Sequence, residues 1–178
     1  MPRRLILASP LLEITISRLC QQLIENHQDF SQSVVLGLQP RGIHLAERIH
    51  RELQSTTGRT IPFGLLDATF HRDDFRRRDS PLKPNQTKIP FVIEGKRVIL
   101  IDDVIATGRM IRAALDAMTF FGRPRKVELV VLIDRRYNRD LPIEPDYVGQ
   151  RVHTLDSQRV LVEWREQGHE KDSIWLID

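Results

Sequence analysis

Residues 98–108 read Val98-Ile99-Leu100-Ile101-Asp102-Asp103-Val104-Ile105-Ala106-Thr107-Gly108, and this stretch decides the fold class. Its first four residues form a continuous apolar run, which is typical of a parallel strand covered on both faces. From Gly108 to about Phe121 apolar residues recur at helical spacing, and residues 129–133 predict a second buried strand. A strand, a helix and a strand in this order form a crossover unit, which is almost always right-handed. The sequence therefore predicts an α/β fold with a mostly parallel central sheet flanked by helices.

Four further segments predict the remaining strands and helices of this fold. Residues 9–26 have apolar positions at helical spacing, with Ser9-Pro10 as the N-cap and first turn. Residues 34–38 predict a strand, residues 43–53 a helix, and residues 63–70 another strand. Together with the crossover unit they alternate as expected for one parallel sheet.

Two regions depart from this alternation. Residues 71–88 are polar, rich in arginine and aspartate, and contain Pro81 and Pro84. A long segment without regular structure inside a compact domain is usually a functional loop or a disordered one, so we expect a flexible loop here. Near the end of the chain, residues 160–162 and 174–177 predict short strands, which would form a small antiparallel hood or C-terminal addition.

Length and composition narrow the class of protein. The chain has 178 residues, so we expect a single domain over residues 1–178. Its 27 Lys and Arg against 24 Asp and Glu give a net charge of +3, which neither requires nor excludes a nucleic-acid partner. The longest apolar run, residues 129–133, is too short to span a membrane, and the first residues do not read as a signal peptide. The single cysteine, Cys20, favours a reducing, cytoplasmic location.

The acids of the opening stretch are the first candidates for a site. Ligands of an open parallel sheet bind beyond the carboxyl ends of its strands. There, Asp102 and Asp103 can accept hydrogen bonds from the two hydroxyls of a ribose. Thr107 and Gly108 come at a helix start, where free backbone N–H groups favour a phosphate. The spacing suits a ribose 5-phosphate, although a pair of acids after an apolar strand is, taken alone, more often a Mg²⁺ site or a solvated strand end.

Two other strand ends contain candidate residues. The turn over residues 37–42 precedes a helix, and its Arg41 offers a planar fork for phosphate oxygens. A plain strand-to-helix turn is the alternative for this segment. Asp134 and Arg135 follow the strand over residues 129–133 and could line the same site or form a structural salt bridge.

The whole stretch over residues 98–108 resembles the 5-phosphoribosyl-1-pyrophosphate (PRPP) motif of the type I phosphoribosyltransferases: a hydrophobic strand, two acids, two aliphatic residues, a variable residue and Thr-Gly. Most of the chain is similar, in order, to one subfamily, the pyr operon attenuator / uracil phosphoribosyltransferase (PyrR) family. The similar segments are residues 37–46, 66–74, 98–118, 131–134, 141–143 and 146–149. The resemblance implies a type I phosphoribosyltransferase fold, the reaction of uracil with PRPP to give UMP and pyrophosphate, Mg²⁺, homo-oligomers, and in many members RNA binding that controls transcription.

The resemblance also implies roles for particular residues. Asp102 and Asp103 would be the catalytic residues that hold the ribose, with Mg²⁺ near them bound mainly by substrate and water rather than by direct protein ligands. The residues expected to bind PRPP are Arg41, Gly42, Arg72, Asp102, Asp103, Ala106, Thr107, Gly108, Arg109 and Met110. Asp134 and Arg135 would lie on the base or pyrophosphate side. The loop over residues 71–88 would act as a lid against water, and its Arg76-Arg77-Arg78 run would be either a phosphate-facing patch or a solvated surface.

Some positions depart from the family pattern. Ala106 replaces the aromatic residue that is usual in this subfamily. The purine branch of the superfamily has at this position an aspartate that acts as a base on the purine, so a purine is a poor substrate expectation. Met110 stands where a threonine or serine usually supplies a hydroxyl to the 5-phosphate. The segment over residues 135–140 is altered and one residue longer than usual.

The alternative function is an RNA-binding transcriptional attenuator of pyrimidine genes with weak or no catalysis. Such binding needs a basic face. The resemblance places that face on the first helix and on the region after the strand over residues 129–133, where Arg18 and Arg139 remain. The neighbouring positions hold uncharged or acidic residues: Ile14, Gln21, Glu144 and Gln150. We therefore favour the enzyme, with PRPP and uracil or UMP as ligands, over a protein that binds pyr leader RNA.

Overall fold

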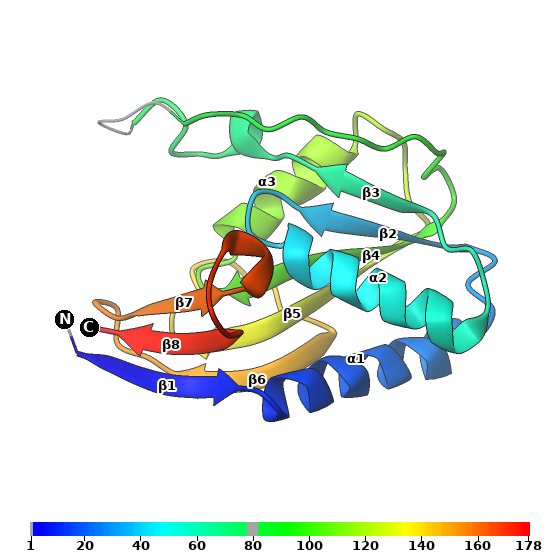
Figure 1. Ribbon diagram of the computed structural model, residues 1–178. Coiled ribbons are helices and arrows are strands. Elements are labelled where there is room, and N and C mark those ends of the chain that lie inside the picture. Colours follow the sequence, from blue (N-terminus) through cyan, green and yellow to red (C-terminus); the bar gives the residue numbers. More distant parts are fainter. Residues whose placement is uncertain (1, 78–81) are drawn as a thin grey trace.

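The structure, a computed structural model, describes residues 2–77 and 82–178 and confirms the α/β fold (Figure 1). In chain order its elements are β1 (Arg3–Ala8), α1 (Leu11–His27), β2 (Ser33–Leu38), α2 (Ile43–Thr57), β3 (Phe63–Leu66), the 3-10 turn η1 (Thr69–His71), β4 (Arg97–Ile105), α3 (Arg109–Met118), β5 (Lys126–Arg136), β6 (Tyr147–His153), β7 (Arg159–Glu163), the 3-10 turn η2 (Arg165–Gln167) and β8 (Ser173–Ile177). No helix of the described residues is both long and apolar enough to cross a membrane.

The central sheet has five parallel strands in the order β3-β2-β4-β5-β6. Alternate residues of β4 face opposite sides, as the pleat of a strand requires. Ile99 and Ile101 pack with residues of α1 and α2, while Val98 and Leu100 pack with residues of α3. Figure 1 shows the same division, with α1 and α2 on the near face and α3 on the far one. Burial on both faces explains why the central strands are continuous apolar runs.

A second, antiparallel sheet of three strands in the order β1-β8-β7 forms the hood. The two C-terminal strands were expected, but β1 was not, since its basic start and short apolar stretch give a weak strand pattern. Figure 1 shows both chain ends at this hood. The fifth strand of the central sheet, β6, was also unexpected, because its sequence Tyr-Val-Gly-Gln-Arg-Val-His is polar and partly exposed.

Several predicted boundaries were wrong by a few residues, among them the end of α2 at Thr57 rather than residue 53 and both ends of β5, and three others have a local cause. Helix α1 begins at Leu11 rather than Ser9, because the Ser9 hydroxyl donates to Glu13 Oε1 (2.5 Å) and Pro10 occupies the N-cap position. Strand β3 ends at Leu66 rather than residue 70, since the Asp67 carboxylate accepts the Thr69 hydroxyl (2.7 Å) and supports the turn η1. Helix α3 ends at Met118, before the turn that follows it.

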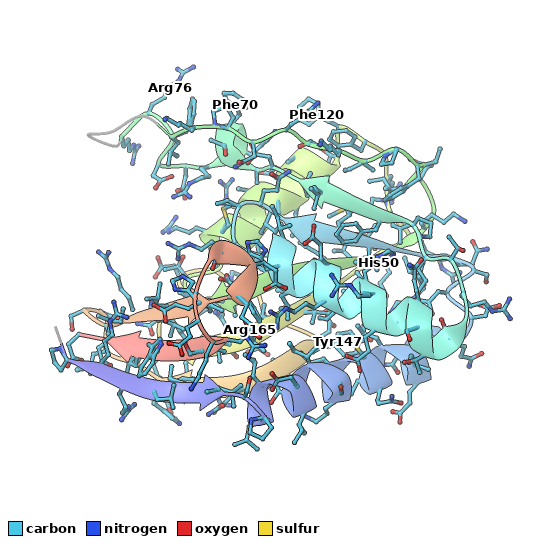
Figure 2. All side chains as sticks on the ribbon, viewed as in Figure 1. His50, Phe70, Arg76, Phe120, Tyr147 and Arg165 are labelled. Atoms are coloured by element: carbon cyan, nitrogen blue, oxygen red, sulfur yellow. The ribbon has the colours of Figure 1, made fainter. Side chains whose placement is uncertain are left out.

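The polar segment after η1 has no helix or strand in its described part, residues 72–77 and 82–88, apart from one bridge between Lys88 and Leu65. Its first residues are held against α3. Arg112 donates to the His71 carbonyl (2.9 Å), and the His71 ring meets Phe120 edge-on, with 5.3 Å between centroids. Figure 2 shows Phe70, Phe120 and Arg76 along this same edge of the molecule.

Candidate active site

Asp102 and Asp103 lie near the carboxyl end of β4, with only 7 % and 6 % of their surfaces exposed. Asp102 Oδ1 accepts the N–H of Asp103 (2.9 Å), and Asp103 Oδ1 accepts the N–H of Val104 (2.7 Å). Burial raises the pKa of both carboxyls, and the charge of Asp103 raises the pKa of Asp102 further, while Arg41 opposes both shifts. Neither acid makes an ion pair within the described residues. The site is thus built to receive hydroxyls or a cation.

A cleft of about 550 Å³ opens over these two acids. It brings together seven of the residues predicted from the sequence: Arg41, Arg72, Asp102, Asp103, Ala106, Met110 and Arg135. The carboxyl ends of β2, β4 and β5 meet at this edge of the sheet, which is why segments distant in sequence line one cleft.

A smaller cleft of about 220 Å³ adjoins the first, because Arg72 and Met110 line both. Its other lining residues include Thr107 and Arg109, so it contains the predicted 5-phosphate loop. Gly108 has φ +86°, a left-handed conformation that glycine adopts without strain, and α3 begins directly after it. The structure therefore places the predicted ribose and 5-phosphate residues in neighbouring clefts.

Two predicted phosphate ligands are paired with carboxylates in this structure. Arg109 bridges Asp73 (2.7 Å) and Asp140 (3.0 Å). Arg72 makes a two-pronged pair with Asp74 (2.8 and 2.7 Å). A phosphate entering the smaller cleft would compete with these acidic partners for the guanidinium groups.

Gly42 lines neither cleft but fixes the turn that presents Arg41. A Cβ on Gly42 would lie 2.6 Å from the Ile101 carbonyl oxygen and 2.9 Å from Asp102 Cα. Only glycine allows the turn to approach β4 this closely.

Asp134 and Arg135 were predicted to lie on the same side of the site, but only Arg135 lines the larger cleft. Asp134 is buried and lines neither cleft. It forms a salt bridge with Arg139 (2.7 Å) and lies 3.7 Å from Arg151, so the structure supports the alternative of a structural salt bridge for Asp134. Arg135 does line the larger cleft, but its guanidinium donates to Thr154 Oγ1 (3.1 Å) and to the Gln158 carbonyl (2.7 Å). It therefore supports the turn before β7.

Other lining residues were missed by the sequence reasoning. Gln39 donates from its amide to the Gln86 carbonyl (2.7 Å), which ties the turn after β2 to the polar segment. Arg159 and Val160 enter the cleft from β7. No sequence signal marks these positions, because the hood reaches the cleft only through tertiary packing. Arg76 and Arg77 are exposed and line neither cleft, and Arg78 lies outside the described residues.

The sequence matches the family of the phosphoribosyl transferase domain over residues 4–167. It is 44 % identical to the Bifunctional protein PyrR of Desulfosudis oleivorans over 151 residues, covering 85 % of this chain and 83 % of that protein. It is 38 % identical to the Bifunctional protein pyrR of Enterococcus faecalis (strain ATCC 47077 / OG1RF), covering 94 % and 93 %.

Solved structures are similar in fold. The hypoxanthine phosphoribosyltransferase of Trypanosoma cruzi has a TM-score of 0.73 at 14 % identity, covering 97 % of this chain and 95 % of that one. A hypoxanthine-guanine phosphoribosyltransferase of Bacillus anthracis has a TM-score of 0.72 at 16 % identity, covering both chains completely. At this identity the similarity shows the fold alone.

Proposed function

The chain belongs to the phosphoribosyl transferase domain family and, within it, to the PyrR proteins, and on this premise we propose that it transfers the ribose 5-phosphate of PRPP to uracil, giving UMP and pyrophosphate. One observation supports this most directly. The buried pair Asp102 and Asp103 lies near the carboxyl end of the central strand β4, which leads into a glycine-containing loop at the start of α3. A diol-binding pair of acids and a phosphate-binding helix start therefore lie one loop apart.

In this proposal the protein binds and orients PRPP rather than supplying a nucleophile. Asp102 and Asp103 accept hydrogen bonds from the ribose hydroxyls, and the loop over residues 106–109 holds the 5-phosphate. Arg41 and Arg72 face the leaving pyrophosphate. As the bond from the anomeric carbon to pyrophosphate breaks, positive charge develops on the sugar ring, and fixed groups placed in advance stabilise it.

The residues present fit Mg²⁺ brought in with the substrate. Asp102 and Asp103 are hard oxygen donors without a salt bridge in the described residues, although Arg41 lies close enough to lower the pKa of both, and such donors suit a divalent cation. The described residues contain no group of three acidic, histidine or cysteine side chains that could hold a metal ion. We therefore propose that substrate oxygens and water supply most of the ligands. When bound, the ion offsets charge on the leaving pyrophosphate.

We propose uracil rather than a purine as the base. Ala106 lines the larger cleft at the position where the purine branch has an acidic side chain, and alanine cannot exchange a proton with a purine. The base would enter beside Arg159 and Val160 of β7. The single buried Cys20 agrees with a cytoplasmic enzyme.

The test is direct. Purified protein is incubated with PRPP and Mg²⁺, and with uracil, hypoxanthine or guanine in separate reactions, and nucleotide is measured. We expect UMP from uracil and little product from either purine. Nucleotide from hypoxanthine alone would contradict the uracil proposal, and no nucleotide from any base would contradict the enzyme.

The second candidate function, an RNA-binding attenuator, has less support from the surface expected to bind RNA. Arg18 donates to the carbonyls of Val148 (3.3 Å) and Gly149 (2.5 Å). Arg139 is engaged with Asp134. Exposed Glu144 adds a negative charge to the same region. Tight, salt-dependent binding of pyr leader RNA in a protein that makes no UMP would reverse our order of the two functions.

Met110→Thr tests the placement of the 5-phosphate loop. Met110 lies in the first turn of α3 and lines both clefts. A threonine hydroxyl there would add one hydrogen bond to a charged phosphate, about 1.5–3 kcal/mol. We expect the KM for PRPP to fall about tenfold while the KM for uracil changes little. Steady-state kinetics with each substrate varied in turn would show it, and an unchanged or raised KM for PRPP would contradict the placement.

A further inference from the structure

Residues 139–141 form a strap that lies against the 5-phosphate loop, residues 106–108. Arg139 Nη1 donates to the carbonyl oxygen of Ala106. The backbone N–H groups of Asp140 and Leu141 both donate to the carbonyl oxygen of Thr107 (3.0 and 3.2 Å). Two successive carbonyls of the loop are thus held on the side of the strap.

The strap is anchored to the central sheet. The other arm of the Arg139 fork, Nη2, donates to Asp134 Oδ1 (2.7 Å). Asp134 is buried at the end of β5, and its backbone is in register with Ile105 of β4, the residue directly before the loop. One planar guanidinium therefore connects the end of β5 to the loop that follows β4, a geometry that a lysine ammonium cannot reproduce.

This arrangement determines where the loop's donors point. In a trans peptide the C=O and the N–H point in opposite directions, and the peptides of this loop are trans. Holding the carbonyls of Ala106 and Thr107 toward the strap therefore directs the N–H groups of Thr107 and Gly108 away from it. Within the described residues neither N–H has a backbone acceptor. They remain available to an anion.

Packing keeps the loop in this state. A Cβ built on Gly108 would lie 3.4 Å from Ile143 Cβ and 3.5 Å from Arg139 Cδ, so the strap and Ile143 leave room beside the glycine for little more than one methyl group. The smaller cleft lies at the same loop, lined by Thr107, Arg109 and Met110.

We propose that Arg139 is a positioning residue for PRPP: by holding the Ala106 carbonyl against Asp134, it aims the N–H groups of the loop at the 5-phosphate. This role rests on the proposed function and adds a residue to it. Arg139 lines neither cleft and acts through the backbone of the loop, so its loss should affect PRPP and not the base.

Arg139→Met tests this role, because methionine keeps an aliphatic side chain at this position and removes the guanidinium group. Arg136→Met is the matched control, since Arg136 is an exposed arginine three residues before Arg139, at the end of β5, and its side chain has no hydrogen bond or ion pair with the residues that the structure describes. We expect R139M to raise the KM for PRPP about tenfold, the loss of one charge-assisted hydrogen bond, with the KM for uracil unchanged. R139K should recover only part of this loss, and R136M should match the wild type.

A second readout does not need activity. The amides of Asp140 and Leu141 donate to the loop in the wild type, so their hydrogen exchange reports whether strap and loop stay together. We expect faster exchange of these two amides in R139M, with unchanged exchange in the core of β4. If the wild type makes no nucleotide, the proposed function fails, but the exchange result still shows whether Arg139 holds the strap against the loop. Equal rises of KM for both substrates, or unchanged exchange in R139M, would overturn the proposal.

Discussion

Asp102→Asn is expected to reduce UMP formation by about 10²- to 10³-fold and, in the same protein, to raise the melting temperature by a few degrees. Activity should fall because an amide presents one acceptor and one donor where the ribose hydroxyls need two acceptors. The local fold should persist, because the amide oxygen can still accept the N–H of Asp103, as Asp102 Oδ1 does (2.9 Å).

Stability should rise because the two acids are buried side by side without a salt bridge in the described residues. Removing one charge relieves both the burial of that charge and its repulsion from Asp103. The gain should be on the order of 1 kcal/mol, a trade of stability against function.

The pH dependence distinguishes this cause from a general packing effect. Burial and Asp103 raise the pKa of Asp102 well above its usual range. The folded wild type therefore binds a proton more readily than the unfolded chain, and its stability falls as pH rises through the raised pKa. Asparagine does not titrate, so the advantage of the variant should be largest at pH values above the raised pKa. It should shrink as the pH falls below the raised pKa and disappear once the pH reaches the ordinary range of an aspartate in the unfolded chain.

Asp134→Asn is the matched control for stability. Asp134 is as buried as Asp102 and also ends a strand of the central sheet, but it is paired with Arg139. Removing its charge leaves a partly buried guanidinium without its carboxylate and should lower the melting temperature. Thermal unfolding of both variants across pH measures the contrast. A melting temperature for Asp102→Asn that stays below the wild type even at the most alkaline pH would contradict our account of the pair.

The parts of this fold that the sequence predicted well are those buried on both sides. Strands β2, β4 and β5 are continuous apolar runs, since helices cover both faces, and α2 and α3 show the spacing of one buried face. The PRPP residues from Asp102 to Met110 were predicted as a group because they are consecutive. In this stretch the residues that form the local sequence pattern are also the residues that line the site.

The parts that escaped prediction depend on partners distant in the chain. Strands β1 and β6 are edge strands whose residues are partly exposed. Each is held in place by pairing with one neighbour, β1 with β8 and β6 with β5. Arg159 reaches the cleft because the hood folds over it. Asp134 was predicted to line the site because it follows a strand. In the structure its carboxylate instead pairs with Arg139 and lies near Arg151, and no local sequence pattern indicates that these two arginines approach it.

Gly42→Ala is expected to lower kcat/KM for PRPP by about two orders of magnitude, a larger loss than its effect on folding explains. Gly42 has φ −70°, so alanine meets no backbone strain there. The obstacle is contact: the new Cβ would lie 2.6 Å from the Ile101 carbonyl oxygen and 2.7 Å from that of Leu38. Both belong to backbone of the central sheet and cannot rotate away. The start of α2 must move instead, and Arg41 moves with it.

Gly149→Ala separates this displacement from simple overpacking. Its Cβ would collide with the Leu132 carbonyl oxygen, an equally severe contact, but Gly149 is in β6 and lines neither cleft. Each variant should lose about 1–3 kcal/mol of stability. At temperatures below the unfolding transition, Gly149→Ala should keep the wild-type KM for PRPP and Gly42→Ala should not. Only Gly42→Ala displaces a turn that packs against Asp102. Wild-type kinetics for Gly42→Ala would show that this turn does not hold the pyrophosphate side of the site.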